Sequence, residues 1–332
     1  TDPDWRGSDW VSTLDGYAIF AAPDTDQFYI SAIDDASTLD ALDFSSADKN
    51  PDVIVTHRVV GNELLMMGKR SIELYVNSGE DFPFARYTSA PIEVGVVGNR
   101  AAINAAESLY WVGQTGRGVA YLYELQGNQP VRISTQAVEE SLLACTDLTQ
   151  ITMWTYQAEG AEFVAVNGPG IPTTWVFDVS TRKWHERCEL IDGSYRALRV
   201  DQVIHYKENL YAVAGAEIDL MSRDIHSIVD GPLVRERTWP HLIKPSFEPV
   251  TYRGVELMCT TGHDAAEAQI TLEISNDGGY AWNPPLLRGL GAIGRRMQKI
   301  RWLMLGSSID RVFRVRVSSP VPVTFHGCAI DA

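Results

Sequence analysis

Long apolar runs and targeting signals are missing from this 332-residue sequence. A membrane-spanning helix needs about 20 consecutive apolar residues, and no run in the chain approaches that length. The N-terminal region also lacks a basic segment followed by an apolar one, which is the pattern of a secretory signal. We therefore expect no membrane insertion and no address signal.

Cysteine is scarce, and the few that occur lie far apart. None forms a CxxC pair or the Cys/His spacing of a zinc site. The four are Cys145, Cys188, Cys259 and Cys328. We interpret them as reduced, partly buried thiols, and we expect neither a metal nor a cofactor.

Catalytic signatures are missing as well. The seven histidines are scattered without HxH or HExxH spacing, and no serine lies in a GxSxG elbow. Asp24-Thr25-Asp26 and Asp34-Asp35 lack the glycine-punctuated spacing of a calcium loop, so we interpret them as exposed loop acids. Two carboxylates could converge in space as a glycosidase pair, but the sequence does not give their separation. The sequence favours a protein that is not an enzyme.

The charge is acidic overall and unevenly spread. A formal charge of -15 argues against wrapping of nucleic acid by the whole molecule. Twelve acids and two bases lie in Thr1–Asp52, whereas Leu286–Val317 holds eight bases and one acid. Such polarity suits head-to-tail contacts between copies. The candidate interface residues are Arg288, Arg295, Arg296, Lys299 and Arg301.

A degenerate repeat decides the predicted architecture. Five apolar hairpins recur, each with two short strands around a Gly-, Pro- or Asp-bearing turn. They are Gly16–Ile33, Asn62–Val76, Glu107–Leu125, Ala161–Val179 and Glu208–Ser222. Equivalent positions are Tyr29, Tyr75, Tyr123, Phe177 and Leu220. Their spacing of 43 to 54 residues is that of a four-stranded propeller blade. We predict a β-propeller, with similar hairpins in an unrelated β-protein as the alternative.

The fourth unit ends in TTWVFDVSTRKWHER, which looks like the end of a kelch-type blade. We expect Trp184 to pack between neighbouring blades. Only two short stretches, Ser37–Leu42 and Val138–Leu143, are candidates for a turn or two of helix. The fold class is therefore all-β.

A change of pattern marks a second domain. The segment Gly231–Pro249 contains four prolines and reads as a crossing segment or boundary. Strand-like runs follow it and favour a β-sandwich of roughly 80 residues. They are Val250–Thr261, Ala268–Ser275, Met297–Leu305, Val312–Ser318 and Val321–Ile330. We assign residues 1–240 to the propeller and 241–332 to the C-terminal β-sandwich.

The run SNDGGYAW fits an Asp-box pattern of Ser275, Asp277, Gly279 and Trp282. Asp277 can bond the backbone of its own turn, the glycines supply positive φ, and the tryptophan packs the hairpin on its sheet. Sialidases carry such boxes away from the catalytic pocket and repeat them through their blades, whereas one copy occurs here. We favour a structural turn and retain a carbohydrate-binding or sialidase-like propeller as the alternative function.

Three long ordered strings carry a family resemblance. They are Val11–Asp48, Glu63–Arg86 and Ile274–Pro320, the last containing DGG-x-x-W, a basic loop, RWLMLG and FRVRVSSP in that order. The chain resembles, over nearly its whole length, the tail accessory factor of short-tailed phages, also called packaged DNA stabilization protein. Members of this family are generally longer at the N-terminus, so the resemblance implies further blade material ahead of Thr1.

The resemblance implies a structural role in the virion tail, after assembly in the host cytoplasm. It implies a ring of copies, resembling a hexamer, that joins the portal-adaptor ring to the tail needle and lies near the tailspikes. Packaged DNA would be a partner only indirectly, because the assembled ring blocks its exit. A propeller scaffold of cellular origin is a third reading.

Overall fold

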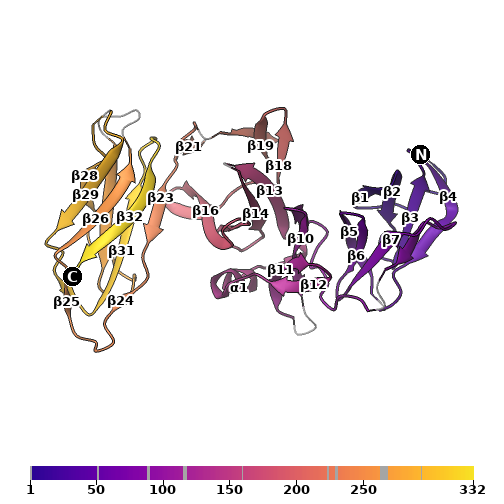
Figure 1. Cartoon of the computed structure of the whole chain (residues 1–332), viewed down its shortest axis with the longest axis horizontal. Coiled ribbons are helices and arrows are strands. Elements are labelled where there is room, and N and C mark those ends of the chain that lie inside the picture. Colours follow the sequence, from indigo (N-terminus) through magenta and orange to yellow (C-terminus); the bar gives the residue numbers. More distant parts are fainter. Residues whose placement is uncertain are drawn as a thin grey trace. The chain divides into compact units, whose positions relative to one another are not determined.

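Short antiparallel strands make up most of the chain. The computed structural model describes residues 2–50, 52–87, 90–114, 118–158, 160–222, 224–228, 231–261, 268–292 and 294–332. They divide into two compact units, the first being Thr1–Cys188 with Tyr195–Leu220 and the second Glu189–Ser194 with Met221–Ala332 (Figure 1). Helix accounts for 4% and strand for 55% of the chain, as the alternation of apolar and polar residues predicts.

Five antiparallel sheets follow one another along the described part of the chain. The first contains β1 (Val11–Leu14), β2 (Tyr17–Ala21), β3 (Gln27–Ala32) and β4 (Asp35–Ser46). The second contains β5 (Ile54–Val60), β6 (Glu63–Gly68), β7 (Ile72–Asn77) and β8 (Phe84–Arg86). The third contains β9 (Ala102–Ala105), β10 (Ser108–Gln114), β11 (Ala120–Gln126) and β12 (Gln129–Arg132).

The last two sheets differ in strand number. The fourth contains β13 (Thr152–Ala158), β14 (Ala161–Asn167), β15 (Thr174–Asp178), β16 (Lys183–Ile191) and β17 (Ser194–Ala197). The fifth contains β18 (Gln202–Tyr206), β19 (Asn209–Ala214) and β20 (Glu217–Met221). A short pair, β21 (Ser227–Ile228) and β22 (Gly231–Pro232), follows.

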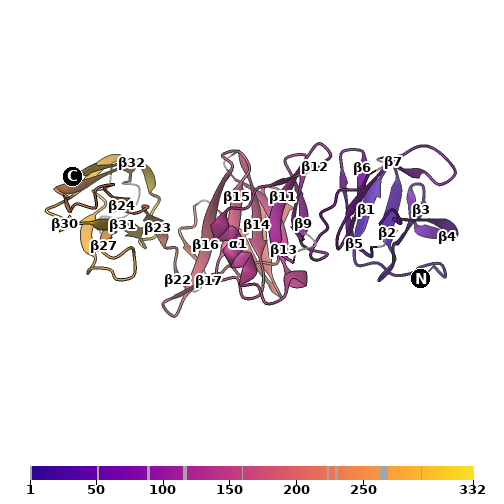
Figure 2. The same cartoon turned by 90° about the horizontal axis from the view of Figure 1, so that it is seen from below.

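The sheets are the predicted blades. The positions taken as equivalent lie on β3, β7, β11, β15 and β20, which is the third strand of every sheet. The first strands of successive sheets adjoin, from β1 to β5, β9, β13 and β18 (Figures 1 and 2). Each sheet thus presents a face to the next, as in a propeller. The prediction of five blade-like repeats is confirmed.

Apolar side chains fill the spaces between the blades. Phe28 and Ile30 of β3 share one buried cluster with Leu64 and Met66 of β6. A larger cluster runs through the second, third and fourth sheets and includes the fully buried Trp111. Burial of about 25 cal/mol per Å² of apolar surface makes these contacts the main source of stability in the first unit.

Trp184 joins two blades, as expected. It lies on β16 of the fourth sheet, and its indole N–H donates a 2.8 Å hydrogen bond to the carbonyl oxygen of Ile133, which follows β12 of the third. Its ring lies 5.0 Å from that of Phe177. The apolar ring and its one polar group are therefore both satisfied at the blade junction.

Of the two stretches predicted to be helical, one is confirmed and the other is wrong. The helix α1 (Gln136–Leu143) includes the predicted Val138–Leu143, and it buries Val138 and Leu142. The second candidate, Ser37–Leu42, is wrong because these residues belong to β4. Within this stretch, Leu39 pairs with Ser31 on β3. In the described residues, no helix is long and apolar enough to cross a membrane.

The second unit contains two facing sheets. One has the order β23-β31-β27-β28, with β24 also paired to β31, and the other has the order β29-β26-β32; β25 pairs β30. These strands are β23 (Arg235–Thr238), β24 (Leu242–Ile243), β25 (Val250–Thr251), β26 (Gly254–Thr260), β27 (Gln269–Ser275), β28 (Leu286–Gly289), β29 (Met297–Leu303), β30 (Ser307–Ser308), β31 (Asp310–Val317) and β32 (Thr324–Asp331). Alternate residues point inward, so Val255, Leu257 and Trp302 meet Leu272, Phe313 and their neighbours in one core.

The β-sandwich prediction is confirmed, and its strand runs coincide closely with β25 to β27, β29, β31 and β32. Two short strands, β23 and β24, lie inside the proline-bearing segment and pair with β31. The exact division of the chain between residues 240 and 241 stays a prediction. His263 lies outside the described residues.

Candidate functional site

The five candidate interface residues gather around two edge strands of the second unit. Arg288 lies on β28, Lys299 and Arg301 lie on β29, and the other two precede β29 in the connecting segment. Each strand is the edge of its sheet. The indole of Trp302 donates to the carbonyl oxygen of Leu286 at 2.9 Å, and Arg288 Nε donates to the carbonyl oxygen of Arg301 at 3.1 Å. The two edges therefore meet, and they bring the basic residues together.

Two of these cations are compensated within the sheet. Glu256 on β26 forms ion pairs with Lys299 and, at 2.6 Å, with Arg301 Nε. The hydrogen bond from Lys299, helped by the charge of Arg301, lowers the pKa of Glu256. The register that sets Glu256 opposite Arg301 creates this arrangement. Lys299 and Arg301 thus contribute little net charge to a partner.

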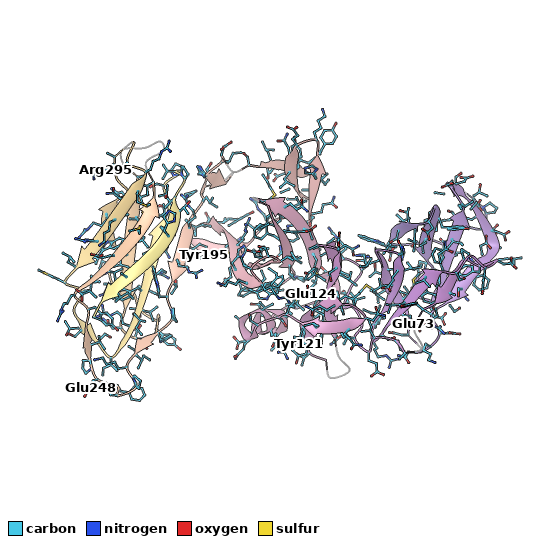
Figure 3. All side chains as sticks on the ribbon, in the orientation of Figure 1. Glu73, Tyr121, Glu124, Tyr195, Glu248 and Arg295 are labelled. Carbon is cyan, nitrogen blue, oxygen red and sulfur yellow. The ribbon has the colours of Figure 1, made fainter. Side chains whose placement is uncertain are left out.

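Arg295 and Arg296 add two exposed charges to that of Arg288, which bonds only carbonyl oxygens; Figure 3 labels Arg295. Neither side chain has an ion pair within the described residues, although the backbone carbonyl of Arg296 accepts a 2.8 Å bond from Thr261. Because this bond holds the backbone, the two guanidinium groups extend from a fixed position. They are therefore the strongest candidates among the five for an acidic partner.

Exposed apolar side chains lie among the cations. Leu286 is 40% exposed, Leu287 53%, Met297 65% and Leu303 63%. A surface that mixes arginine with leucine and methionine resembles a protein–protein interface more than a solvated charged face. We call β28, β29 and the segment between them, with these apolar residues and the five cations, the basic edge.

The Asp-box residues form a closed hydrogen-bonded turn between β27 and β28. Ser275 Oγ donates to Asp277 Oδ1 at 2.7 Å and accepts from the backbone N–H of Gly279 at 2.8 Å. The same Asp277 oxygen accepts from Ala281 N–H at 2.9 Å. This bond, followed by that from Ser275, lowers the pKa of Asp277. The turn fixes where β28 begins and therefore where Arg288 lies.

Trp282 and Gly279 have separate roles in this turn. The guanidinium of Arg314 lies 3.8 Å from the Trp282 ring centroid, a cation–π contact that holds the hairpin end on β31. Gly279 has φ +94°, which a side chain would strain. All four residues therefore serve the turn's own geometry.

Three further arginines of the basic stretch have structural roles, which the sequence alone did not distinguish from those of the other basic residues. Arg314 pairs with Glu273 at 2.6 Å, and Arg316 pairs with Glu236 at 2.8 Å. Arg311 is 1% exposed and donates to the carbonyl oxygen of Leu305. The alternation Phe313-Arg314-Val315-Arg316-Val317 was the available signal, because it places both arginines on one sheet face beside other strands.

The expected loop acids show no metal site. Within the described residues, no group of His, Cys, Asp and Glu is placed to hold a metal ion. Asp35 instead accepts bonds from the backbone and hydroxyl of Ser37, and the hydroxyl bond is the main reason that the pKa of Asp35 is lowered. The Asp35 carboxylate therefore stabilises its own turn.

Two buried carboxylates of the propeller are fully engaged (Figure 3). Glu73 accepts from Tyr75, Arg86 and the backbone of Lys49. Glu124 accepts from Tyr110, Arg182 and Gln126. Burial acts to raise the pKa of Glu124, but these hydrogen bonds outweigh it and lower the pKa overall.

One cleft in the first unit has a polar lining. Its volume is about 470 Å³, and its walls come from the ends of β13, β14 and β17 and from the β19–β20 hairpin. Arg199, Asp201 and Glu217 lie in its wall. Asp201 Oδ2 accepts a 2.8 Å bond from the backbone of Gly215, so this carboxylate already braces the hairpin.

Family models decide the relationship of the chain. Residues 1–208 match the model described as bacteriophage P22 Gp10, beta-propeller, and residues 237–332 match bacteriophage P22 Gp10, beta-sandwich. The chain belongs to the P22 Gp10 family. It is a phage structural protein of the tail-hub type, and the resemblance found in the sequence is confirmed.

Other comparisons add little. No curated protein sequence matches the chain. Similar solved structures include an exo-beta-1,3-galactanase from Phanerochaete chrysosporium, with 9% identity, a TM-score of 0.31 and coverage of 97% of this chain and 95% of that one. A family 43 arabinoxylan arabinofuranohydrolase from Bacillus subtilis has 10% identity, a TM-score of 0.29 and coverage of 96% and 94%. These scores are too low to support an argument about activity.

Proposed function

We propose that this chain is a non-enzymatic tail-hub protein that assembles as a ring, resembling a hexamer, below the portal-adaptor ring. In this role it stabilises packaged DNA in the capsid and provides the attachment site for the tail needle, with tailspikes nearby. It acts in the virion tail after assembly in the host cytoplasm. The family match over both domains supports the proposal.

The basic edge is the observation that carries the assembly part of the proposal. It presents three exposed arginines without an ion pair among the described residues, and four exposed apolar side chains, on a protein of net charge -15. A heterologous contact between a basic patch and an acidic patch of the next copy closes into a ring when the rotation allows it. The mixture of charge and apolar area supplies both orientation and buried surface.

Retention of DNA then needs no chemistry. A closed ring of copies, with the tail needle attached, blocks the exit of the DNA sterically. The excess of acids along the chain, 43 against 28 bases, disfavours adhesion of DNA to the protein. A ring of this kind would release the genome once the tail needle is removed.

Depletion of the chain during phage assembly tests this function. Particles formed without it should package DNA and then lose it, and addition of the purified chain to freshly packaged particles should restore retention. Particles that retain DNA equally well without the chain would contradict the proposal. The protein content of the particles, measured in parallel, shows whether the chain was incorporated.

One observation, the polar cleft in the propeller, favours the alternative function of a carbohydrate-binding or sialidase-like protein. Arg199, Asp201 and Glu217 are residue types that bind sugars or catalyse their hydrolysis. The hydrogen bond from Gly215 to Asp201 and the family match favour the structural reading. A panel of bacterial surface glycans separates the two functions, because only the alternative requires binding or hydrolysis.

A further inference from the structure

The outer strand of the first sheet contains an unusual interruption. β4 has twelve residues, whereas β3, the strand with which it pairs in the sheet, has six. Phe44 pairs with Tyr29 and Leu39 pairs with Ser31, so the four residues 40–43 have no partners on β3. This segment, Asp40–Asp43, is called the β4 bulge. It lies on β4, which is an edge strand of its sheet (Figure 1).

The bulge has a defined conformation. Arg6 Nη2 donates to the carbonyl oxygen of Ala41 at 2.7 Å, and its guanidinium lies 4.8 Å from the ring centroid of Phe44. The backbone N–H of Leu42 donates to Asp40 Oδ1 at 2.9 Å. These contacts hold Leu42 at the tip, where its side chain is 81% exposed. A single exposed leucine is common on protein surfaces, so its meaning here depends on the charges around it.

Acids flank the exposed leucine. Asp40 and Asp43 have no ion pair within the described residues. Partial burial, together with the charge of Asp40, raises the pKa of Asp43. A cation brought by a partner would relieve this repulsion. The bulge therefore presents one exposed leucine between two aspartates.

We propose that the β4 bulge of one copy docks on the basic edge of a second copy. The two surfaces match in kind: Leu42 lies between acids, and Leu287 and Met297 lie among arginines. The bulge offers two carboxylates without an ion pair, with the guanidinium of Arg6 nearby, and the basic edge offers three arginines without an ion pair among the described residues. The inference rests on the proposed ring, and it names the surfaces that form the contact.

Charge complementarity favours a second copy of this chain as the partner that binds the basic edge. A phosphate-rich partner would suit Arg295 and Arg296 but would leave the exposed leucine and methionine residues without an apolar contact. The contact is heterologous, because different surfaces of the two copies meet. Each copy in a ring would therefore use its bulge toward one neighbour and its basic edge toward the other.

A two-chain cross-linking experiment tests the contact. Leu42→Cys is introduced into one chain and Met297→Cys into another, so a disulfide between the new thiols can form only between copies. Both positions are exposed, at 81% and 65%, and substitution there should leave the fold intact. The two chains are mixed under mild oxidation, both in solution and in assembled particles. We expect a cross-linked dimer that is at least about tenfold more abundant than with either variant alone.

Val11→Cys supplies a matched control. Val11 is an apolar residue, 55% exposed, on β1 at the opposite edge of the same sheet. Paired with Met297→Cys, it should give no more product than the native cysteines do. Equal products for the Leu42 and Val11 pairs, or no product in particles that contain the protein, would overturn the docking assignment while leaving the hub function standing. Absence of the wild-type protein from particles would instead count against the hub function and the docking together.

Discussion

Ser275 and Asp277 share a 2.7 Å hydrogen bond in which the serine hydroxyl donates to the carboxylate. The serine oxygen also accepts the backbone N–H groups of Asp277 and Gly279. One buried hydroxyl thus organises a turn that begins the strand carrying Arg288. The turn is a structural support of the basic edge.

Ser275→Ala should lower the free energy of unfolding by about 1–2 kcal/mol, because it removes these bonds and leaves backbone donors buried. Asp277→Ala should also lower the denaturation midpoint. Urea unfolding followed by tryptophan fluorescence measures both. Asn276→Ala is the matched control, since its exposed side chain lies between the two residues and makes no hydrogen bond within the described part of the chain. Equal stability of all three variants would show that the turn bonds are dispensable.

Arg58 should stabilise the junction between the second and third sheets. Its guanidinium donates to the carbonyl oxygens of Asn99 and Ala102 at 2.9 Å each, and it lies 3.7 Å from the Trp10 ring centroid. Arg58→Met should cost about 3 kcal/mol, because a buried charged donor is removed from several acceptors. Calorimetry of the purified chain measures the loss. Lys69→Met, which removes an exposed cation, should change stability by less than about 0.5 kcal/mol.

His57 should make stability depend on pH. Burial, followed by the charge of Arg58, lowers the pKa of His57 from 6.5 to about 4. The folded state therefore holds this ring neutral, and its Nε2–H donates to the carbonyl oxygen of Ile19 at 3.0 Å. Because the unfolded chain takes up a proton more readily, the stability contribution is complete above pH 6.5 and falls as the pH drops towards 4.

The expected loss from this residue is of the order of 3 kcal/mol between pH 7 and pH 4. His57→Gln keeps an N–H donor for Ile19 and removes the titrating ring. Unfolding free energies of wild type and variant, measured across this pH range, should therefore diverge in slope. Parallel curves would mean that His57 does not contribute to the acid sensitivity.

The blades could be predicted from the sequence because their apolar hairpins recur at blade spacing, and Tyr29 and Tyr75 indeed occupy the same strand of successive sheets. Ser37–Leu42 was misassigned because the pairing of an interrupted edge strand has no local signature. The basic edge could be located only as a stretch of charge. That Glu256 compensates Lys299 and Arg301 depends on strand register, which joins residues more than 40 positions apart.

The polar cleft should show no glycosidase activity. Asp201 is held by the hairpin backbone, and the proposed role requires no turnover. The chain, incubated with a panel of bacterial surface glycans, should release no reducing sugar above a heat-denatured control. Hydrolysis that disappears in Asp201→Asn or Glu217→Gln, with the fold intact by circular dichroism, would favour the carbohydrate alternative.

Incorporation of an Arg295→Glu/Arg296→Glu chain into tails, with the DNA that those particles retain, tests the central claim most directly. Reversal at these exposed positions should leave the fold intact and slow assembly, since rim charge mainly governs association rate and salt sensitivity. Arg237→Glu/Lys244→Glu makes the same charge change at exposed positions of the second unit. Arg237 lies on β23, at the opposite edge of its sheet from β28, and Lys244 directly follows β24. The account predicts fewer copies per particle and loss of DNA for the first variant, with near wild-type values for the second. Wild-type incorporation and DNA retention by the Arg295/Arg296 variant across a range of salt concentrations would contradict it.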